Sequence, residues 1–169
     1  MTSGSNTKLK SGRNAEEFKN LPAEAVAEAR GKLGAGTVES GKYDCVISGD
    51  QMRSLLSAFW SMFSAKMVQH GMSLLKGRIG EKIASDIVNV TDDPRRPECD
   101  IQTSFDGEGV ATYRKSIIEN GVFKTLLYNL KTAAVAGKKT TGNASKAGYD
   151  SSVGIRPFTM YLEGGELTE

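Results

Sequence analysis

The sequence predicts an α+β fold in which a long buried helix packs on a mainly antiparallel sheet with a prominent β-hairpin. Large apolar residues recur at helical spacing over residues 50–69, which is the pattern of an amphipathic helix. Two β-rich runs over residues 110–127 flank Asn120-Gly121, a dipeptide whose tolerance of positive φ suits a type I′ hairpin turn. A long helix together with a hairpin indicates one mixed domain.

Size and charge narrow the class of protein. The chain has 169 residues, which suffices for one domain with a sizeable core. The 22 basic residues nearly balance the 20 acidic ones, so charge gives no reason to expect a nucleic-acid partner. Residues 1–10 hold no apolar run, and no later stretch approaches the roughly 20 apolar residues of a membrane span. We therefore expect a cytoplasmic protein with neither a nucleic acid nor a membrane as partner.

The N-terminal part differs in composition from the rest. Residues 1–13 are polar, and residues 14–33 are rich in Ala, Glu and Lys, which favours a weakly apolar helix. Residues 41–48 read as a short buried strand. We accordingly predict a tail and helix or linker over residues 1–40, and the first part of a larger domain over residues 41–169.

The helix over residues 50–69 has recognisable ends. Ser48 is the expected N-cap, Gln51 completes a capping-box pattern, and Gly71 suits a helix stop. Trp60 widens the apolar face, so we expect burial on more than one side. The apolar stripe consists of Met52, Leu55, Leu56, Phe59, Met62, Phe63 and Met67.

The second half of the chain alternates short elements with loops. Residues 73–85 contain two glycines and read as a closely packed loop, and residues 87–91 as a strand. After the hairpin we expect a short helix over residues 130–136 and a final strand over residues 158–163. That strand needs a partner and no edge-protecting element follows it, so we expect the chain to be a fragment of a larger domain.

No group of residues forms a self-sufficient active site. His70, the one histidine, stands at a helix end, where a solvated side chain is the favoured reading. The acids of residues 92–100, together with Cys99, could ligate a metal, although a solvated loop is favoured. Asp106 and Glu108 could act as paired carboxylates, although turn formers or salt-bridge partners are the favoured reading. Residues 137–148 are rich in Gly and Lys but lack the ending of a P-loop.

Five short phrases nevertheless stand in a familiar order. Together they resemble the TldD/PmbA family, long called modulators of DNA gyrase, over about residues 41–163. This range corresponds to the first half or so of the family's C-terminal domain. The phrases are residues 73–85, 90–93, 105–110, 118–122 and 141–144.

The resemblance implies a function that composition does not. Family members form a two-subunit metallopeptidase that degrades or matures flexible peptides, and the TldD-type subunit binds zinc through a HExxxH helix. The corresponding positions here are Leu56, Ser57 and Ser61, none of which can replace the lost groups. The chain is therefore similar to the PmbA/TldE-type subunit, with no catalytic residue, no metal ligand and no cofactor of its own. Zinc is expected in a TldD-type partner.

The partners follow from the same resemblance: a TldD-type subunit, in a heteromer or homodimer, and a peptide substrate. The candidate contacts to peptide or partner are Asn120, Gly121, Gly142 and Asn143. The hairpin could capture a peptide as an added strand, although an internal hairpin is the favoured reading. Two alternatives stay open. One is a non-enzymatic binding or scaffold protein that modulates another complex such as DNA gyrase, and the other is an independent hydrolase that uses the acids of residues 92–100 with a metal.

Overall fold

The computed structural model describes residues 19–99 and 101–165. The chain divides into two units, with the boundary between Val46 and Ile47. In the first unit, α1 (Leu21–Gly31) confirms the expected helix where it is described, and none of its residues is buried. Residues 41–48 form no strand and are exposed. The prediction of a buried strand there was wrong, because an apolar run becomes a strand only where a neighbouring strand can pair with it.

The expected long helix is three shorter elements. These are α2 (Gly49–Phe59), the 3₁₀ turn η2 (Trp60–Phe63) and α3 (Ala65–Gln69). Ser48 stands at the predicted N-cap position, without a capping hydrogen bond from its side chain. None of the residues of α2 is buried, so the prediction of a helix buried on more than one side was wrong for this part. Burial begins at Phe63.

Backbone hydrogen bonds to a distant residue explain the break. Ser64 is extended, with φ −77° and ψ 125°. On either side of it, Phe63 O accepts from Leu127 N at 2.8 Å, and Ala65 N donates to Leu127 O at 2.9 Å. These two bonds replace intrahelical ones, so the chain leaves the helix for one residue and then resumes it.

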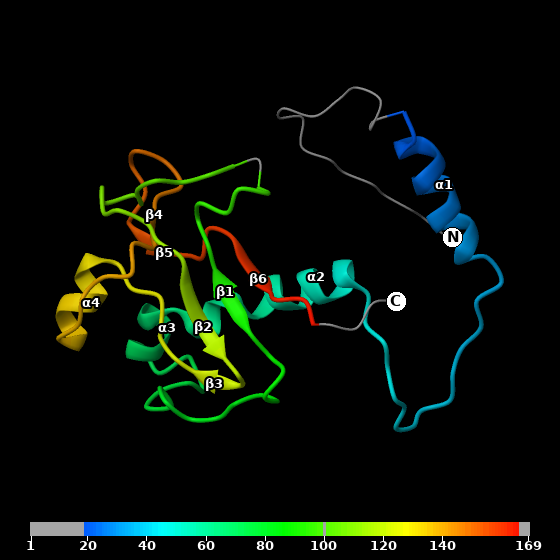
Figure 1. The fold of residues 1–169 in the computed structure, drawn as a ribbon, viewed down its shortest axis with the longest axis horizontal. Coiled ribbons are helices and arrows are strands. Elements are labelled where there is room, and N and C mark those ends of the chain that lie inside the picture. The colour runs from blue at the N-terminus through cyan, green and yellow to red at the C-terminus, as the bar shows by residue number, and fades with distance from the viewer. Residues whose placement is uncertain (1–18, 100, 166–169) are drawn as a thin grey trace. The chain divides into compact units, whose positions relative to one another are not determined.

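The strands form two sheets (Figure 1). The larger has four antiparallel strands in the order β3-β2-β1-β6, and β4 pairs with β5 in the smaller. The mixed helical and antiparallel architecture confirms the predicted α+β class. The strands are β1 (Val90–Asp92), β2 (Lys115–Glu119), β3 (Val122–Phe123), β4 (Ala144–Ser145), β5 (Gly154–Ile155) and β6 (Met160–Leu162).

The hairpin joins β2 to β3 as predicted. Asn120 and Gly121 have φ of 48° and 74°, the pair of positive values that a type I′ turn requires. The outer edge of β3 is already occupied, because Gly80 N donates to Phe123 O at 2.7 Å and Phe123 N donates to Glu81 O at 2.9 Å. This favours the reading of the hairpin as an internal part of the sheet.

The predicted short helix is α4 (Leu130–Ala136). A capping box of Asn129 and Thr132 starts it, and Gly137, at φ 62°, ends it. In Figure 1, α2 lies next to β6, and α4 lies at the opposite end of this unit. The core gathers side chains of η2, α3, β1, the hairpin and the segment before α4, among them Phe63, Val68, Val90, Ile117, Phe123 and Leu127.

Candidate functional site

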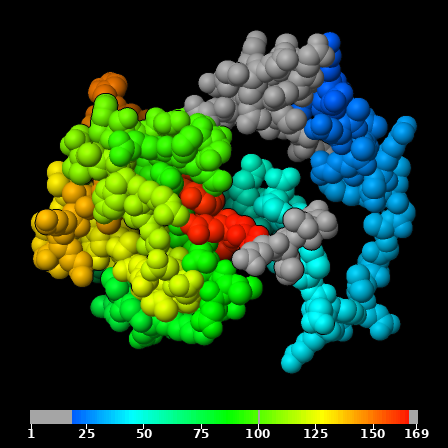
Figure 2. All heavy atoms as spheres, viewed as in Figure 1, coloured from blue at the N-terminus to red at the C-terminus, as the bar shows by residue number. Residues whose placement is uncertain are grey.

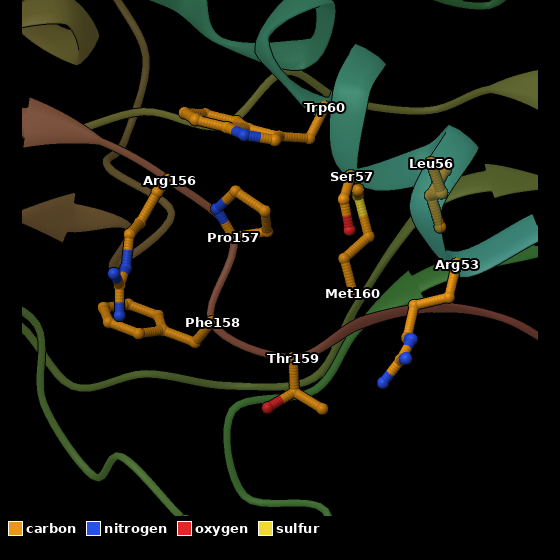
Figure 3. Close-up of a pocket in the computed structure, with 9 residues that line it drawn as sticks. All are labelled: Arg53, Leu56, Ser57, Trp60, Arg156, Pro157, Phe158, Thr159 and Met160. Atoms are coloured by element: carbon orange, nitrogen blue, oxygen red, sulfur yellow. The ribbon is translucent and has the colours of Figure 1, made fainter. Parts of the chain in front are cut away.

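The helix α2 and the segment that leads into β6 enclose a pocket of about 540 Å³ (Figure 3). Figure 2 shows β6, in red, at the surface of this unit between green segments of the chain and the cyan α2. The size is within the range of small-molecule and peptide side-chain sites. Its walls are Arg53, Leu56, Ser57 and Trp60 from the helical side, and Arg156, Pro157, Phe158, Thr159 and Met160 from the other.

Both charged side chains of this lining are arginines. The Arg156 guanidinium lies over the Phe158 ring, 5.8 Å from its centroid, within the range of a cation–π contact. Arg53 makes a 3.4 Å ion pair with Asp50 one turn earlier in α2, and both side chains are largely exposed. Such an exposed pair is weak, so the Arg53 guanidinium remains available to a ligand.

Two of the three positions at which the sequence resemblance places the zinc helix lie at this pocket. Leu56 and Ser57 line it, and Ser61 belongs to η2. A leucine has no donor atom, and a neutral serine hydroxyl is a poor zinc ligand and a poor base at pH 7. In the described part of the chain, no three His, Cys, Asp or Glu side chains gather closely enough to hold a metal ion. The side chains of Leu56, Ser57 and Ser61 therefore do not fit a zinc ion.

A fully buried carboxylate holds the wall of the pocket in place. Asp92 accepts from the backbone N–H groups of Phe158 at 3.0 Å and Thr159 at 2.9 Å. Its second oxygen accepts from the Asn143 amide at 2.8 Å and from the Lys115 ammonium at 3.4 Å. Because each oxygen has two donors, the backbone of the wall is fixed to the end of β1.

The Lys115 ammonium is the cation that pairs with the buried Asp92 carboxylate. Its side chain is 4% exposed, and that of Asp92 is 0% exposed. Burial lowers the pKa of the Lys115 ammonium below its ordinary value, and the neighbouring Asp92 carboxylate opposes that shift. The ammonium also lies 4.7 Å from the centre of the Tyr113 ring.

Asn143 joins the buried carboxylate to the rim of the pocket. Besides its bond to Asp92, its amide donates to Arg156 O at 3.0 Å, and Arg156 N donates to Asn143 O at 3.1 Å. Its own side-chain oxygen accepts from the Thr141 hydroxyl at 2.8 Å. All polar atoms of the Asn143 side chain are therefore used within the fold, and the backbone of Arg156 is held on both sides.

The four candidate contact residues do not come together at one surface. Asn143 is 0% exposed, Gly142 and Gly121 are buried, and Asn120 is exposed. Gly142 has φ +66°, and a Cβ there would lie 2.7 Å from Ala111 O, so the position requires glycine. Contact with a peptide or a partner stays a prediction, and among the four it concerns Asn120 most directly.

Asp106 and Glu108 serve the local fold. Asp106 accepts from the backbone N–H groups of Glu108, Val110 and Ala144 at 2.9, 3.0 and 2.9 Å. Glu108 accepts from Leu130 N at 2.8 Å, at the first turn of α4, where a negative charge is favourable. Asp106 is thus a turn former, one of the favoured alternatives, whereas Glu108 accepts a backbone hydrogen bond at the start of α4.

The remaining sequence candidates lie apart. His70 is exposed at the C-cap of α3. Asp92 faces the interior of the fold, whereas the exposed Glu98 pairs with Arg96 at 2.9 Å. Asp100 lies outside the described residues. None of the helices in the described ranges is both long and apolar enough to cross a bilayer.

Comparison with known proteins decides the family. A family model described as the PmbA/TldA metallopeptidase C-terminal domain matches residues 40–169. The chain belongs to the TldD/PmbA family.

Three relatives illustrate the similarity. A Thermotoga maritima protein described as a proposed modulator of a DNA gyrase is 37% identical, with a TM-score of 0.83 over 98% of this chain and 37% of its own. TldE from Thermococcus kodakarensis is 31% identical, with a TM-score of 0.60 over 64% of this chain and 24% of its own. A Methanothermobacter thermautotrophicus metalloprotease is 32% identical over 154 residues, which make up 90% of this chain and 34% of the relative. This TldD/PmbA chain thus spans between 24% and 37% of the length of these proteins.

Proposed function

We propose that this chain is part of a PmbA/TldE-like subunit of a two-subunit metallopeptidase that degrades or matures flexible peptides. In this proposal the subunit lacks the zinc-binding HExxxH, and a TldD-type partner contributes it. The observation that carries the proposal is the chemistry at Leu56, Ser57 and Ser61. Two of these side chains line a pocket, and none of the three offers a charged donor to a metal.

The relatives support the peptidase part of the proposal. One is named a metalloprotease, another is named TldE, and the matching family model describes a metallopeptidase domain. The zinc of the partner would supply an activated water and polarise the scissile carbonyl. The residues of this chain would instead hold the peptide and exclude water.

The pocket and the adjoining strand suit an extended peptide. Antiparallel β6 hydrogen-bonds to β1 through Glu163 N to Asn89 O and Asp93 N to Thr159 O, at 2.9 Å each. Hydrogen-bonded and non-hydrogen-bonded residue pairs alternate along two antiparallel strands, so the backbone N–H and C=O groups of Met160 point away from β1. Within the described residues β6 has no second neighbouring strand, so its outer edge offers donors and acceptors to an added strand.

The test is co-expression of the chain with a HExxxH-bearing family member. We expect the two to co-purify, and we expect the complex to cleave an unfolded peptide in a chelator-sensitive reaction. Neither chain alone is expected to match that activity. Ser61→Ala should leave both the zinc content and the cleavage rate of the complex within about twofold, because the proposal gives Ser61 no role as a ligand.

Two outcomes would contradict the proposal. Chelator-sensitive cleavage by this chain alone would make it a catalytic subunit, and loss of zinc in Ser61→Ala would make Ser61 a ligand. A second candidate is a non-enzymatic binding or scaffold protein, favoured by the Thermotoga maritima relative that is described as a proposed modulator of a DNA gyrase. Stable binding to gyrase, with no cleavage in the presence of any HExxxH-bearing chain, would favour this candidate.

A further inference from the structure

We infer that the pocket between α2 and β6 binds the free C-terminal carboxylate of a peptide whose last residue is apolar. The inference rests on the proposed function, because it takes a peptide as the ligand. It goes further by naming which end of the peptide is recognised and which side chains recognise it. The Arg156 guanidinium would bind the carboxylate, and the apolar walls would receive the last side chain.

The charge of the lining points to an anion. Among the described residues, Arg53 and Arg156 are the charged side chains that line the pocket, and none of the lining residues is an acid. Arg156 has no ion pair within the described residues, and the Arg53 side chain is 78% exposed beside its partner Asp50. In Figure 3 the two arginines stand on opposite sides of the pocket. A guanidinium binds a carboxylate through two parallel N–H donors, which gives both strength and orientation.

The remaining lining points to an apolar group beside that anion. Trp60, Pro157 and Phe158 present ring surfaces, and Leu56 and Met160 add aliphatic surface. A C-terminal residue carries its carboxylate and its side chain on the same Cα, so both groups can reach their partners at once. In an internal glutamate or aspartate the carboxylate ends the side chain, so no separate apolar side chain is attached to the same Cα. A free phosphate carries no apolar group at all.

The Arg156 side of the site is held by buried groups rather than by a mobile loop. Its backbone N–H donates to Asn143 O at 3.1 Å, and its carbonyl accepts from the Asn143 amide at 3.0 Å. The next wall residues, Phe158 and Thr159, donate to the buried Asp92. A fixed backbone limits the ordering cost that a ligand must meet on binding.

Trp60 provides a direct probe, because it is the one tryptophan in the sequence and it lines the pocket. The experiment titrates the 169-residue chain with three peptides and follows tryptophan emission. The peptides are acetyl-Ala-Ala-Leu-Leu with a free carboxylate, the same peptide as its C-terminal amide, and acetyl-Ala-Glu-Leu-Leu amide. The third peptide separates a side-chain carboxylate from a terminal one.

We expect the acid to bind about tenfold or more tightly than either amide, since one charge-assisted interaction is lost with the terminal carboxylate. Arg156→Gln should weaken binding of the acid by roughly tenfold and leave binding of the amides within about twofold. Arg53→Gln changes the opposite side of the pocket, so a smaller loss of about twofold to threefold is expected. Arg95→Gln is the matched control. Arg95 is an exposed arginine outside the lining, and its variant should bind all three peptides as the unaltered chain does.

Several results would overturn the inference. Equal binding of the acid and its amide would remove the terminal carboxylate from recognition, and tight binding of the glutamate-containing amide would assign recognition to a side chain. If Arg95→Gln weakened binding of the acid as much as Arg156→Gln does, the binding would reflect general attraction between charges and not a specific site. An unchanged Trp60 emission at millimolar peptide would exclude the pocket as the site. The assay needs neither zinc nor a partner, so its failure is distinct from a failure to co-purify with a HExxxH-bearing chain.

Discussion

Replacing Asp92 by asparagine tests how the wall of the pocket is held. An asparagine of the same size keeps one oxygen, which can still accept from the N–H groups of Phe158 and Thr159. Its NH₂ group then faces the amide of Asn143 and the ammonium of Lys115, so donors meet donors. The ammonium is also left buried without its counter-charge. We expect a loss of about 3–5 kcal/mol in the free energy of unfolding, as for other buried pairs broken at one partner.

The assay is urea unfolding at pH 7 of four proteins: the unaltered chain, Asp92→Asn, Lys115→Met and the double variant. Lys115→Met leaves the carboxylate three N–H donors, so a smaller loss of about 1–3 kcal/mol is expected. The double variant should lose less than the sum by about 1–3 kcal/mol, because the two groups interact directly. Lys82→Met is the control. It breaks an ion pair with Asp86 whose side chains are 56% and 75% exposed, which should cost no more than about 0.5 kcal/mol.

Either of two results would contradict this role of Asp92. If Asp92→Asn lowers the free energy of unfolding no more than Lys82→Met does, the carboxylate does not organise this region. A double variant equal to the sum of the single losses would show that Asp92 and Lys115 act independently.

Two further predictions concern the hairpin turn at Gly121 and the stability of the chain at alkaline pH. Gly121→Ala should lower the free energy of unfolding by about 3 kcal/mol or more, because φ is +74° and a Cβ would lie 2.7 Å from Ser85 O. Gly137→Ala, at φ +62° with nothing within 4 Å, should cost only about 1 kcal/mol in the same urea assay, and equal losses would contradict this. Burial raises the pKa of Tyr128, so the unfolded chain releases that proton first and stability falls as pH rises above about 10. Tyr128→Phe should make the fall between about pH 9 and 11 shallower, and an unchanged slope in pH-dependent unfolding would refute this.

Local chemistry was enough to predict several elements from the sequence. Asn120-Gly121 specified the hairpin turn, because few other dipeptides accept two positive φ values. The helix over residues 130–136 was found with the bounds that α4 has, since its capping and its glycine stop are encoded next to it. The final strand over residues 158–163 contains β6.

Contacts between residues far apart in the chain determine the features that could not be predicted from the sequence. The helical stripe continues through Ser64, yet two hydrogen bonds to Leu127, far along the chain, break the helix there. The pocket could not be predicted either, because one part of its lining comes from residues 53–60 and the other from residues 156–160, far along the chain. No short motif contains both parts, so no spacing in the sequence marks them as one site.

The double use of Asn143 has a consequence for anyone who redesigns this molecule. One amide side chain bonds both to an interior acid and to the main chain at the opening of the cavity. Substitutions that loosen the interior will therefore shift the opening as well, and resistance to denaturant and ligand affinity should change together across such a series. To change ligand recognition while keeping the stability of the fold, one should substitute Arg53 or Arg156 and leave Asn143 unchanged.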